Sequence, residues 1–431
     1  MNMSKGLKQV KQGSKSRRQF RSGNGLFFQH WLPPLDLTDT YPDHWKYLSE
    51  GGATLVFSYA GPQDERFHNK VLRLGKNNTV VEDEDSLILF QTEVISRLVL
   101  QKHLAVLETV LLSSSWLESL SSLCKKSRPD WRTGDIDTNR TKGFLATNLV
   151  SSPISVEIKP KWSFLRPGLR TCRFCMHSSC RGWITSYCPL DLFSSSPARI
   201  KNALYALYDA WADGAASQNN FRLFADGRLM SPDDLLPALR GLGMLHSSIL
   251  EEEGIRELVV ETLLVSFMKS ESLELLKTLK NLQRTLDGLG IEGLASLWDN
   301  VHSLDKTSFG GGFPQPTIDD WKFFVTEYLE PQGSSVPPQA LSGETQLRYN
   351  ILSYLLSATF KDCSMMIMLP GLLHESLPTS LFPSRITLID LDPKRVERLQ
   401  KWLEQDRNIM QEYIVSSQTK SAKRCVDVGE L

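Results

Sequence analysis

The chain has 431 residues, which is long enough for two domains or lobes. Its composition, 41% hydrophobic and 23% charged residues, is typical of a globular protein. No apolar run approaches the roughly 18–20 residues that would cross a bilayer, and the basic N-terminus lacks the apolar segment of a secretory signal, so we expect no membrane partner. Seven cysteines, an odd number in so long a chain, favour reduced thiols and a location in the nucleus, the cytoplasm or both.

The net charge of zero is unevenly distributed along the chain. Residues 1–22 have seven Lys or Arg and no acid, which leaves a net charge of −7 on the remainder. Residues 1–25, rich in Ser, Gln and Gly, are predicted to be a disordered basic arm. Such an arm is most often a solvated tail, with nuclear import or nucleic-acid tethering as the alternative. A polyanion site on the acidic remainder must therefore be built from locally clustered cations.

The first predicted lobe covers residues 40–150 and contains a β-hairpin. Strands are expected at residues 44–49, 54–59 and 69–74. Gly51 and Gly52 form the first turn, and paired glycines either make a plain turn or let the backbone approach a ligand closely. Residues 84–126 are predicted to be mainly helical, and a short strand with a connector at 143–149 ends the lobe.

A basic stretch opens the second predicted lobe, residues 151–415. Between Ser151 and Arg181 there are six basic side chains and one acid, Glu157. Apolar residues at every second position up to residue 158 predict a half-buried strand. Pro160 then excludes helix and is expected to hold Lys159 and Lys161 on one side of an extended tripeptide. Two ammonium groups so placed suit a ligand with several phosphates, and a solvated basic strand is the alternative.

The rest of this lobe is predicted to be helical up to a final pair of strands. Helices are expected after Ser196-Pro197, over residues 250–305, and over residues 318–329, where Thr317 with Asp320 three residues later resembles a capping box. A helix over 346–360 leads to Asp362, and strands follow at 363–369 and 386–391, which places Asp362 and Asp390 at one end of a hairpin. Asp392-Pro393 is predicted to open the last helix, with Lys394 and Arg398 on one face near its N-terminus, where phosphate binds. Residues 416–431 are predicted to be a tail.

A cysteine-rich segment offers an interpretation from a different class. Cys172, Cys175, His177 and Cys180 have the content of a zinc site, with Cys188 nearby. The corresponding function is a zinc-dependent nucleic-acid-binding protein that also uses the basic arm. Structural zinc sites usually pair two separated knuckles, whereas these four residues crowd into about two helical turns. We therefore expect neither zinc nor a nucleic-acid partner.

Several blocks of sequence resemble, in order, those of one enzyme family. The blocks are Glu50–Ala53, Val156–Trp162, Cys172–His177, Tyr187–Phe193, Gln218–Arg222, Ala358–Ser364 and Ile389–Lys394. They resemble the inositol-pentakisphosphate 2-kinases, whereas residues 225–340 match loosely. The resemblance implies an α+β, two-lobed kinase-like fold, with a smaller β-containing N-lobe and a larger mixed C-lobe with helical insertions. It also implies a monomeric ATP- and Mg²⁺-dependent enzyme that phosphorylates the 2-hydroxyl of inositol 1,3,4,5,6-pentakisphosphate to give inositol hexakisphosphate. A kinase of another inositol polyphosphate is the alternative.

The same resemblance implies roles for individual residues. Those expected at ATP are Gly51, Gly52, Ala53, Arg73, Thr147, Asn148, Leu149 and Glu157. Those expected at the inositol phosphate are Arg132, Lys159, Lys161, Arg181, Asn219, Asn220, Arg222, Lys394 and Arg398. Asp362 would be the catalytic base and Asp390 the Mg²⁺ ligand. Lys159, Lys394 and Arg398 would stabilise the charge of the transferred group. Ser163 and Arg181 depart from the family pattern, which often has Gly and Lys at these positions.

Overall fold

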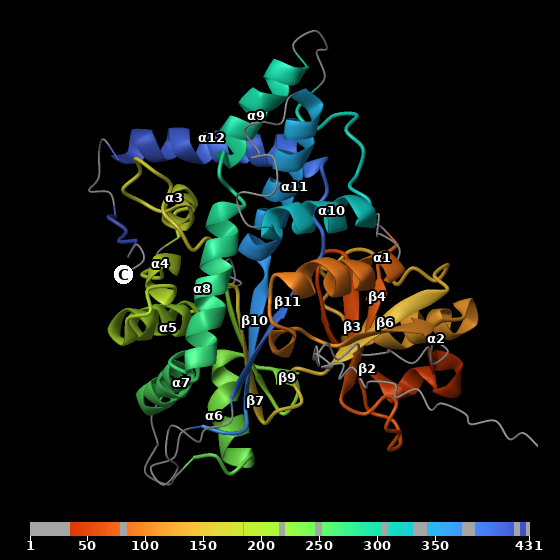
Figure 1. The fold of residues 1–431 in the computed structure, drawn as a ribbon. Coiled ribbons are helices and arrows are strands. Elements are labelled where there is room, and N and C mark those ends of the chain that lie inside the picture. The colour runs from red at the N-terminus through yellow and green to blue at the C-terminus, as the bar shows by residue number, and fades with distance from the viewer. Residues whose placement is uncertain are drawn as a thin grey trace, which may run out of the picture. The chain divides into compact units, whose positions relative to one another are not determined.

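Two β-sheets organise the chain, and each belongs to one part of the sequence (Figure 1). The computed structural model describes residues 35–77, 84–183, 185–214, 220–245, 252–302, 308–330, 343–372, 384–417 and 423–427. The predicted arm at residues 1–25 and Asn219 lie outside the described residues, as does most of the predicted tail. We call residues 35–149 the N-lobe and residues 150–427 the C-lobe. The predicted α+β, kinase-like fold is confirmed, because a β-rich N-lobe precedes a larger mixed C-lobe.

The N-lobe sheet has the strand order β1-β5-β6-β4-β3-β2. Its strands are β1 (Leu35–Asp36), β2 (Trp45–Glu50), β3 (Thr54–Tyr59), β4 (Lys70–Gly75), β5 (Leu107–Leu111) and β6 (Lys142–Thr147). Its α-helices are α1 (Glu84–Leu89) and α2 (Ser114–Cys124). Short helical turns lie before, between and after them: η1 (Leu37–Asp39), η2 (Pro42–His44), η3 (Phe90–Val94), η4 (Ile95–Arg97), η5 (Gln101–His103) and η6 (Lys125–Ser127). The predicted hairpin is confirmed. The prediction that residues 84–126 are mainly helical is wrong at β5, because the helical spacing of apolar residues ends at Leu98 and β5 pairs with both β1 and β6.

The C-lobe sheet has the order β11-β10-β7-β8-β9. Its strands are β7 (Ile154–Ile158), β8 (Phe221–Ala225), β9 (Arg228–Leu229), β10 (Ser364–Leu369) and β11 (Arg385–Ile389). The prediction of a half-buried β7 is wrong, because this central strand is buried at every position. Ile154, Val156 and Ile158 belong to the main apolar core, whereas Ser155 and Glu157 alternate with them on the other face of the strand.

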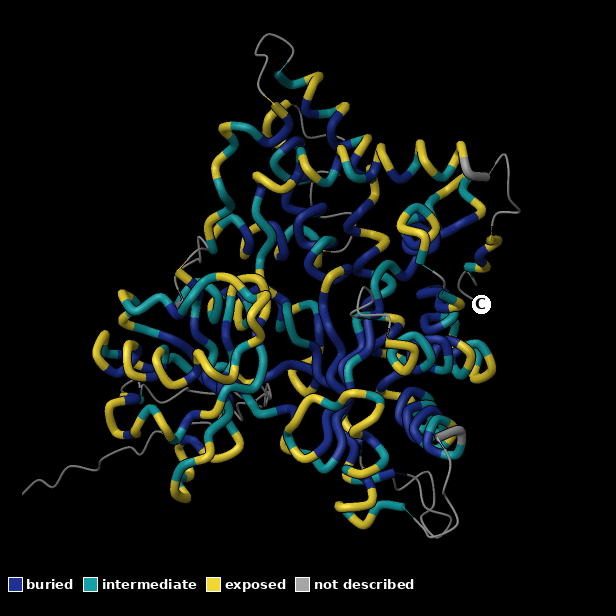
Figure 2. The backbone as a smooth tube through the Cα atoms, turned by 180° about the vertical axis from the view of Figure 1, so that it is seen from behind, coloured by how far each residue is buried: buried dark blue, intermediate teal, exposed yellow. Residues whose placement is uncertain are grey.

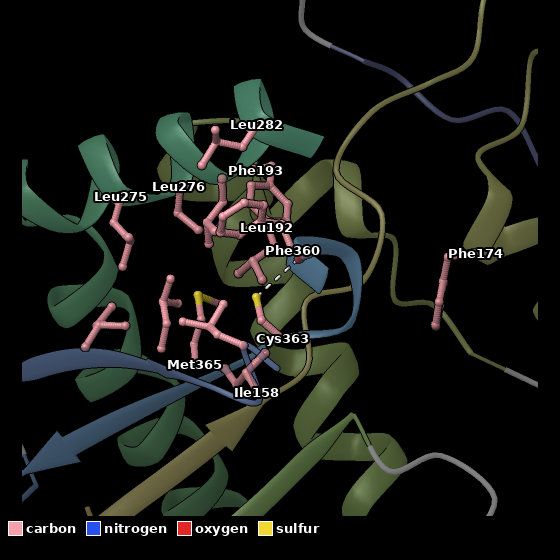
Figure 3. Close-up of a cluster of buried hydrophobic side chains, with 14 of the residues drawn as sticks. Ile158, Phe174, Leu192, Phe193, Leu275, Leu276, Leu282, Phe360, Cys363 and Met365 are labelled. Carbon is pink, nitrogen blue, oxygen red and sulfur yellow. Dashed lines mark hydrogen bonds between the residues drawn. The ribbon is translucent and has the colours of Figure 1, made fainter. Parts of the chain in front are cut away.

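Helices cover the core face of this sheet and extend beyond it (Figure 1). They are α3 (Arg173–Cys180), α4 (Pro189–Leu192), α5 (Pro197–Ala212), α6 (Pro232–Gly241), α7 (Glu252–Phe267), α8 (Ser270–Thr285), α9 (Gly290–Val301), α10 (Ile318–Leu329), α11 (Gly343–Asp362) and α12 (Arg398–Ser417). The central strands β7 and β10 and most of α11 run through the buried interior, whereas the outer faces of the surrounding helices are exposed (Figure 2). The close-up of the core shows Leu276 and Leu282 of α8 with Phe360 of α11 and Met365 of β10 (Figure 3).

The start of the last helix differs from the prediction. Residues 391–395 are irregular, and α12 begins at Arg398 rather than at Pro393. Lys394 therefore lies in the loop before the helix, and the prediction that Lys394 and Arg398 share one helix face is wrong. By contrast, the predicted capping box of α10 is confirmed, with Thr317 Oγ1 accepting from the backbone N–H of Asp320.

Candidate active site

A first pocket with a volume of about 330 Å³ lies between the two lobes. Its apolar wall from the N-lobe comprises Leu48, Val56, Val71 and Ala146, and the wall from the C-lobe comprises Phe224, Met366 and Ile389. The connection between the lobes, Thr147–Val150, also lines it, and charged side chains gather at the ends of β7 and β11. A flat apolar slot with a charged end suits a ligand that joins an aromatic ring to phosphates.

The glycine turn at the edge of this pocket is held from beneath by a buried ion-pair network. Glu50, the last residue of β2, lies 2.6 Å from Lys76 Nζ and 2.9 Å from a terminal nitrogen of Arg128. Burial opposes ionisation of Glu50, but its hydrogen bonds to Arg128 and Lys76 outweigh that effect and lower its pKa. Gly51 and Gly52 follow directly, and no other atom lies within 4 Å of where their Cβ atoms would be. The network therefore fixes the backbone of the turn, whereas the outer surface of the turn stays open.

Lys159 and Asp390 form the charged floor of the first pocket. Lys159 Nζ lies 3.1 Å from Asp390 Oδ2 and 3.9 Å from Glu157 Oε1. The Ser364 hydroxyl lies between these acids, 2.8 Å from Glu157 Oε1 and 3.2 Å from Asp390 Oδ2. Arg222 pairs with the other oxygen of Glu157 at 3.2 Å. Side chains from β7, β8, β10 and the end of β11 therefore converge at one edge of the sheet.

A second carboxylate, Asp362, is held by two lysines on the adjoining surface. Asp362 ends α11, with Oδ2 at 3.0 Å from Lys394 Nζ and Oδ1 at 3.5 Å from Lys161 Nζ. The prediction of an extended Lys159-Pro160-Lys161 tripeptide is wrong at its last residue, because Lys161 has φ +64°. This left-handed residue directs the two lysines to different carboxylates, Lys159 to Asp390 and Lys161 to Asp362.

Both carboxylates are ionised at neutral pH. Burial tends to raise the pKa of Asp362, but the charges of Lys394 and Lys161 lower it below the ordinary value. Burial opposes ionisation of Asp390 in the same way, and Lys159 with Arg73 lowers its pKa. The pKa of Lys161, by contrast, is lowered by burial.

A second pocket, also of about 330 Å³, adjoins Asp362 within the C-lobe. Its charged lining has more cations than acids: the cations are Lys161, Arg173, Lys361, Lys394 and Arg398, the acids are Asp362 and Asp406, and His177, Asn220 and Gln405 complete the polar lining. Trp162, Phe174, Trp183 and Trp402 contribute aromatic surface. The Lys159-Pro160-Lys161 segment links the two pockets, because Lys159 lines the first and Lys161 lines the second. Two ligands, one in each pocket, would therefore approach each other between Asp390 and Asp362.

Two comparisons relate this chain to known proteins. Residues 47–408 match the family model described as inositol-pentakisphosphate 2-kinase. The chain is 30% identical over 434 residues to an inositol-pentakisphosphate 2-kinase of Cryptococcus neoformans, covering 93% of this chain and 100% of that protein. It is 28% identical over 447 residues to the protein of that name from Arabidopsis thaliana, covering 86% and 93% of the two chains. This chain belongs to the inositol-pentakisphosphate 2-kinase family.

The residues assigned through the family resemblance are distributed over both pockets of this kinase. The first pocket is lined by Gly51, Gly52, Arg73, Arg132, Thr147, Asn148, Leu149, Glu157, Lys159, Arg222 and Asp390. The second is lined by Lys161, Asn220, Asp362, Lys394 and Arg398. Three of the residues expected at the inositol phosphate, Arg132, Lys159 and Arg222, therefore line the first pocket. Ala53 is exposed in the glycine turn, and Arg181 Nε donates to His177 Nε2 at 3.2 Å at the end of α3.

Sequence reasoning missed several residues of the kinase site. Ser364 links the acids Glu157 and Asp390. It lies in one of the blocks that resemble the family, but no role was predicted for it because a serine has no charge to signal one. Arg173 and Lys361 line the second pocket from α3 and α11, and both belong to buried ion pairs, with Asp406 at 2.5 Å and Asp287 at 2.8 Å. Their basic character was visible, whereas the fact that these helices face one pocket depends on the tertiary fold.

The cysteines are grouped differently from the set weighed for zinc. Cys172 and Cys175 lie in one cluster with Cys188 and with Cys425 near the C-terminus. His177 and Cys180 do not belong to this cluster, because they follow on later turns of α3. Cys180 Sγ contacts the carbonyl of Ile409 at 3.5 Å instead. The proposed ligand set Cys172, Cys175, His177 and Cys180 is therefore wrong as a set.

Among the helices in the described part of the chain, none combines the length and apolarity needed to cross a bilayer.

Proposed function

We propose that this chain transfers the γ-phosphoryl group of ATP to the 2-hydroxyl of inositol 1,3,4,5,6-pentakisphosphate, giving inositol hexakisphosphate. The observation that carries the proposal is the meeting of two pockets at a cluster of two carboxylates and three lysines in a member of this kinase family. Phosphoryl transfer requires little covalent chemistry, so positioning and charge stabilisation supply most of the catalysis.

The first pocket suits ATP. The adenine would lie between the apolar walls near Thr147–Val150, where backbone groups of an extended connector can recognise its edge. The phosphates would extend under Gly51 and Gly52 toward Arg73 and Lys159. The open space above both glycines supports this placement, because a backbone without side chains can cover phosphates closely.

The second pocket suits the inositol phosphate. Its cations come from α3, α11, the loop before α12 and the segment after β7, so they surround a ligand rather than face it from one side. A ring with phosphates on five carbons needs such a distribution, because each phosphate requires its own donors. Burial on aromatic surface strengthens each of these charge-assisted hydrogen bonds.

Asp362 is the proposed base, since it stands at the junction of the pockets and is ionised at neutral pH. The acceptor hydroxyl would donate to Asp362 while Lys159 and Lys394 balance the charge on the transferring group. Asp390 and Glu157 fit Mg²⁺, because two carboxylates joined through Ser364 present hard oxygen donors beside the pocket that suits ATP. A bound Mg²⁺ would neutralise phosphate charge.

The proposal is tested by incubating the purified protein with ATP, MgCl₂ and inositol 1,3,4,5,6-pentakisphosphate, and by separating the products by anion exchange. We expect inositol hexakisphosphate with a new phosphate at carbon 2, identified by ³¹P NMR. Other inositol polyphosphates tested at the same concentration should react more slowly. No product, or faster reaction with a different inositol phosphate, would contradict the proposal. Location in the nucleus or cytoplasm, the monomeric state and the domain limits stay predictions.

A further inference from the structure

A buried glutamine of α8, Gln283, contacts the backbones of two active-site segments but is not among the residues that line either pocket. Helix α8 lies in the part of the chain that resembles the kinase family only loosely. We propose that Gln283 is a positioning residue, which fixes Lys161 and Asp362 relative to each other for phosphoryl transfer. This inference rests on the proposed function, because Gln283 would act through the proposed base and its neighbouring lysine.

The side-chain amide of Gln283 has all of its hydrogen-bonding capacity filled. Its Oε1 accepts from the backbone N–H of Ser163 at 2.9 Å and from the Ser163 hydroxyl at 3.0 Å. Its Nε2 donates to the Lys161 carbonyl at 3.2 Å and to the Phe360 carbonyl at 2.9 Å. An amide has two donor hydrogens and two acceptor lone pairs, and a flipped amide would set its N–H groups against the donors of Ser163. The orientation of the side chain is therefore fixed.

The two carbonyls belong to the segments that carry the charged groups of the site. Lys161 is the left-handed residue, with φ +64°, whose ammonium pairs with Asp362. Phe360 lies in the last turn of α11, two residues before Asp362, where carbonyls lack a partner within the helix. A single amide group therefore joins the backbone that places the cation to the backbone that places the carboxylate.

Asp287, two residues after the end of α8, reinforces the same connection. Its carboxylate pairs with Lys361 Nζ at 2.8 Å. Both side chains are buried, so separating the two charges would leave each uncompensated. The α8 segment thus holds the Phe360 carbonyl and the Lys361 ammonium, which belong to the two residues directly before Asp362.

The test begins with Gln283→Glu in the full chain. The variant keeps the size of the side chain and an acceptor for Ser163, but even a protonated carboxyl can donate to only one of the two carbonyls. We expect kcat to fall roughly 10–100-fold and the KM for inositol pentakisphosphate to rise, because Lys161 and Asp362 lose their relative placement. The Kd for ATP should change little, since neither of these residues lines the first pocket.

Ser353→Ala is the matched control, because the Ser353 hydroxyl makes another buried contact between α11 and the end of α8, to the Leu286 carbonyl at 2.8 Å. It should lower the free energy of unfolding and leave kcat unchanged. Ser163→Gly should keep most of kcat, because it removes one donor to Oε1 and leaves both carbonyl contacts of Gln283. If Gln283→Glu lowered stability as Ser353→Ala does but kept the kcat of wild type, Gln283 would be structural only and the inference would be wrong.

Hydrogen exchange of the wild type is a measurement that needs neither a variant nor activity. The backbone amide of Ser163 should exchange as slowly as the amides inside α8, because its acceptor is held by bonds to three residues. Exchange of this amide within seconds would show that the contact is not maintained and would overturn the inference. The proposed function fails on a different result, namely a wild type that makes no inositol hexakisphosphate.

Discussion

Two residues of the active site, Lys161 and Asp390, have left-handed backbones without being glycine, with φ values of +64° and +60°. Such a conformation costs on the order of 1–2 kcal/mol for an ordinary residue. At Lys161 the surroundings hold it, because the Gln283 side-chain amide donates to the Lys161 carbonyl at 3.2 Å and Tyr187 Oη donates to the Pro160 carbonyl at 2.9 Å. The strain sets where the charged groups of both pockets point.

The role of Asp362 is tested by Asp362→Asn, which keeps the shape of the side chain but cannot accept the hydroxyl proton. We expect kcat to fall by about 10²–10⁴ while the Kd for ATP changes little, because Asp362 does not line the first pocket. The control is Asp233→Asn, at an exposed position in the first turn of α6. Single-turnover kinetics and nucleotide titration separate these effects. Turnover above a tenth of wild type would exclude Asp362 as the base.

His177, in the second pocket, gives a pH-dependent prediction. Burial and the nearby charge of Arg173 lower its pKa to about 4. The unfolded state, with a pKa near 6.5, therefore binds more protons between about pH 4 and 6.5, and stability attributable to His177 rises with pH in that window. Denaturant unfolding at several pH values should show a smaller rise for His177→Gln than for wild type. Parallel curves would contradict the assignment.

At the scale of elements, the Glu50 network ties the turn between β2 and β3 to the segment before β6. Arg128 reaches Glu50 with one side of its guanidinium and Asp135 with the other, at 2.9 Å. The Gly51-Gly52 turn, which lies over the first pocket, is therefore attached to a loop of the same lobe that is distant in sequence. A buried network of this kind contributes positioning more than stability, but breaking it leaves an uncompensated charge.

Glu50→Gln should destabilise the protein by about 3–5 kcal/mol, because Lys76 and Arg128 then lose their buried counter-charge. The control Glu118→Gln, on the exposed side of α2, should change the free energy of unfolding by less than about 0.5 kcal/mol. Urea unfolding measures both. If the two variants unfold at the same urea concentration, the network does not stabilise the fold. Because the turn also covers the first pocket, the KM for ATP should rise in Glu50→Gln below the melting temperature.

Local patterns predicted elements whose signals lie within a few residues. The glycine turn with its flanking strands and the Thr317 capping box follow from such signals. β5 was missed because its five residues depend on two neighbouring strands rather than on their own periodicity. Pro393 suggested the start of α12, but the chain instead stays irregular up to Arg398 and places Lys394 against Asp362. Tertiary contacts decided both cases.

The candidate site was predicted mainly by resemblance, since a lysine or aspartate in isolation has no distinctive pattern. Neither composition nor spacing could show that Lys159 and Lys161 separate, because that depends on the backbone of one residue. The link from Cys425 to Cys172 was equally hidden, since more than half of the chain lies between them. Such contacts follow only from the fold.

At the scale of the whole molecule, both lobes hold β11, the strand that ends just before Asp390. His103 Nδ1 lies 2.9 Å from the Ile386 carbonyl, and Arg385 donates to the Lys102 carbonyl at 3.1 Å. A β-bridge also joins Leu104 to Leu388. The N-lobe therefore contacts β11 beside the pocket that suits ATP, and movement between the lobes would be transmitted to the Asp390 carboxylate.

The uneven charge of the chain gives a prediction at this scale. Every described residue that lines the two pockets lies between Leu48 and Asp406, so we expect that deleting residues 1–22 leaves both KM values nearly unchanged. Lys161→Ala, by contrast, should raise the KM for inositol pentakisphosphate by the equivalent of about 1.5–3 kcal/mol, and this effect should shrink at high salt. Steady-state kinetics measures both. A truncation as harmful as Lys161→Ala would place the polyanion site in the arm.

The ion pairs around Asp362 have a consequence for when it becomes reactive. Lys161 and Lys394 hold its pKa low, which makes it a poor proton acceptor in the free protein. If the acceptor binds in the second pocket as proposed, its phosphates would compete for the same two ammonium groups and draw them away from the carboxylate. The basicity of Asp362 would then rise only when the acceptor is in place. The substrate would thus activate the base that it needs. A water molecule has no phosphates to bind the lysines, so it would meet a carboxylate that remains ion-paired and weakly basic.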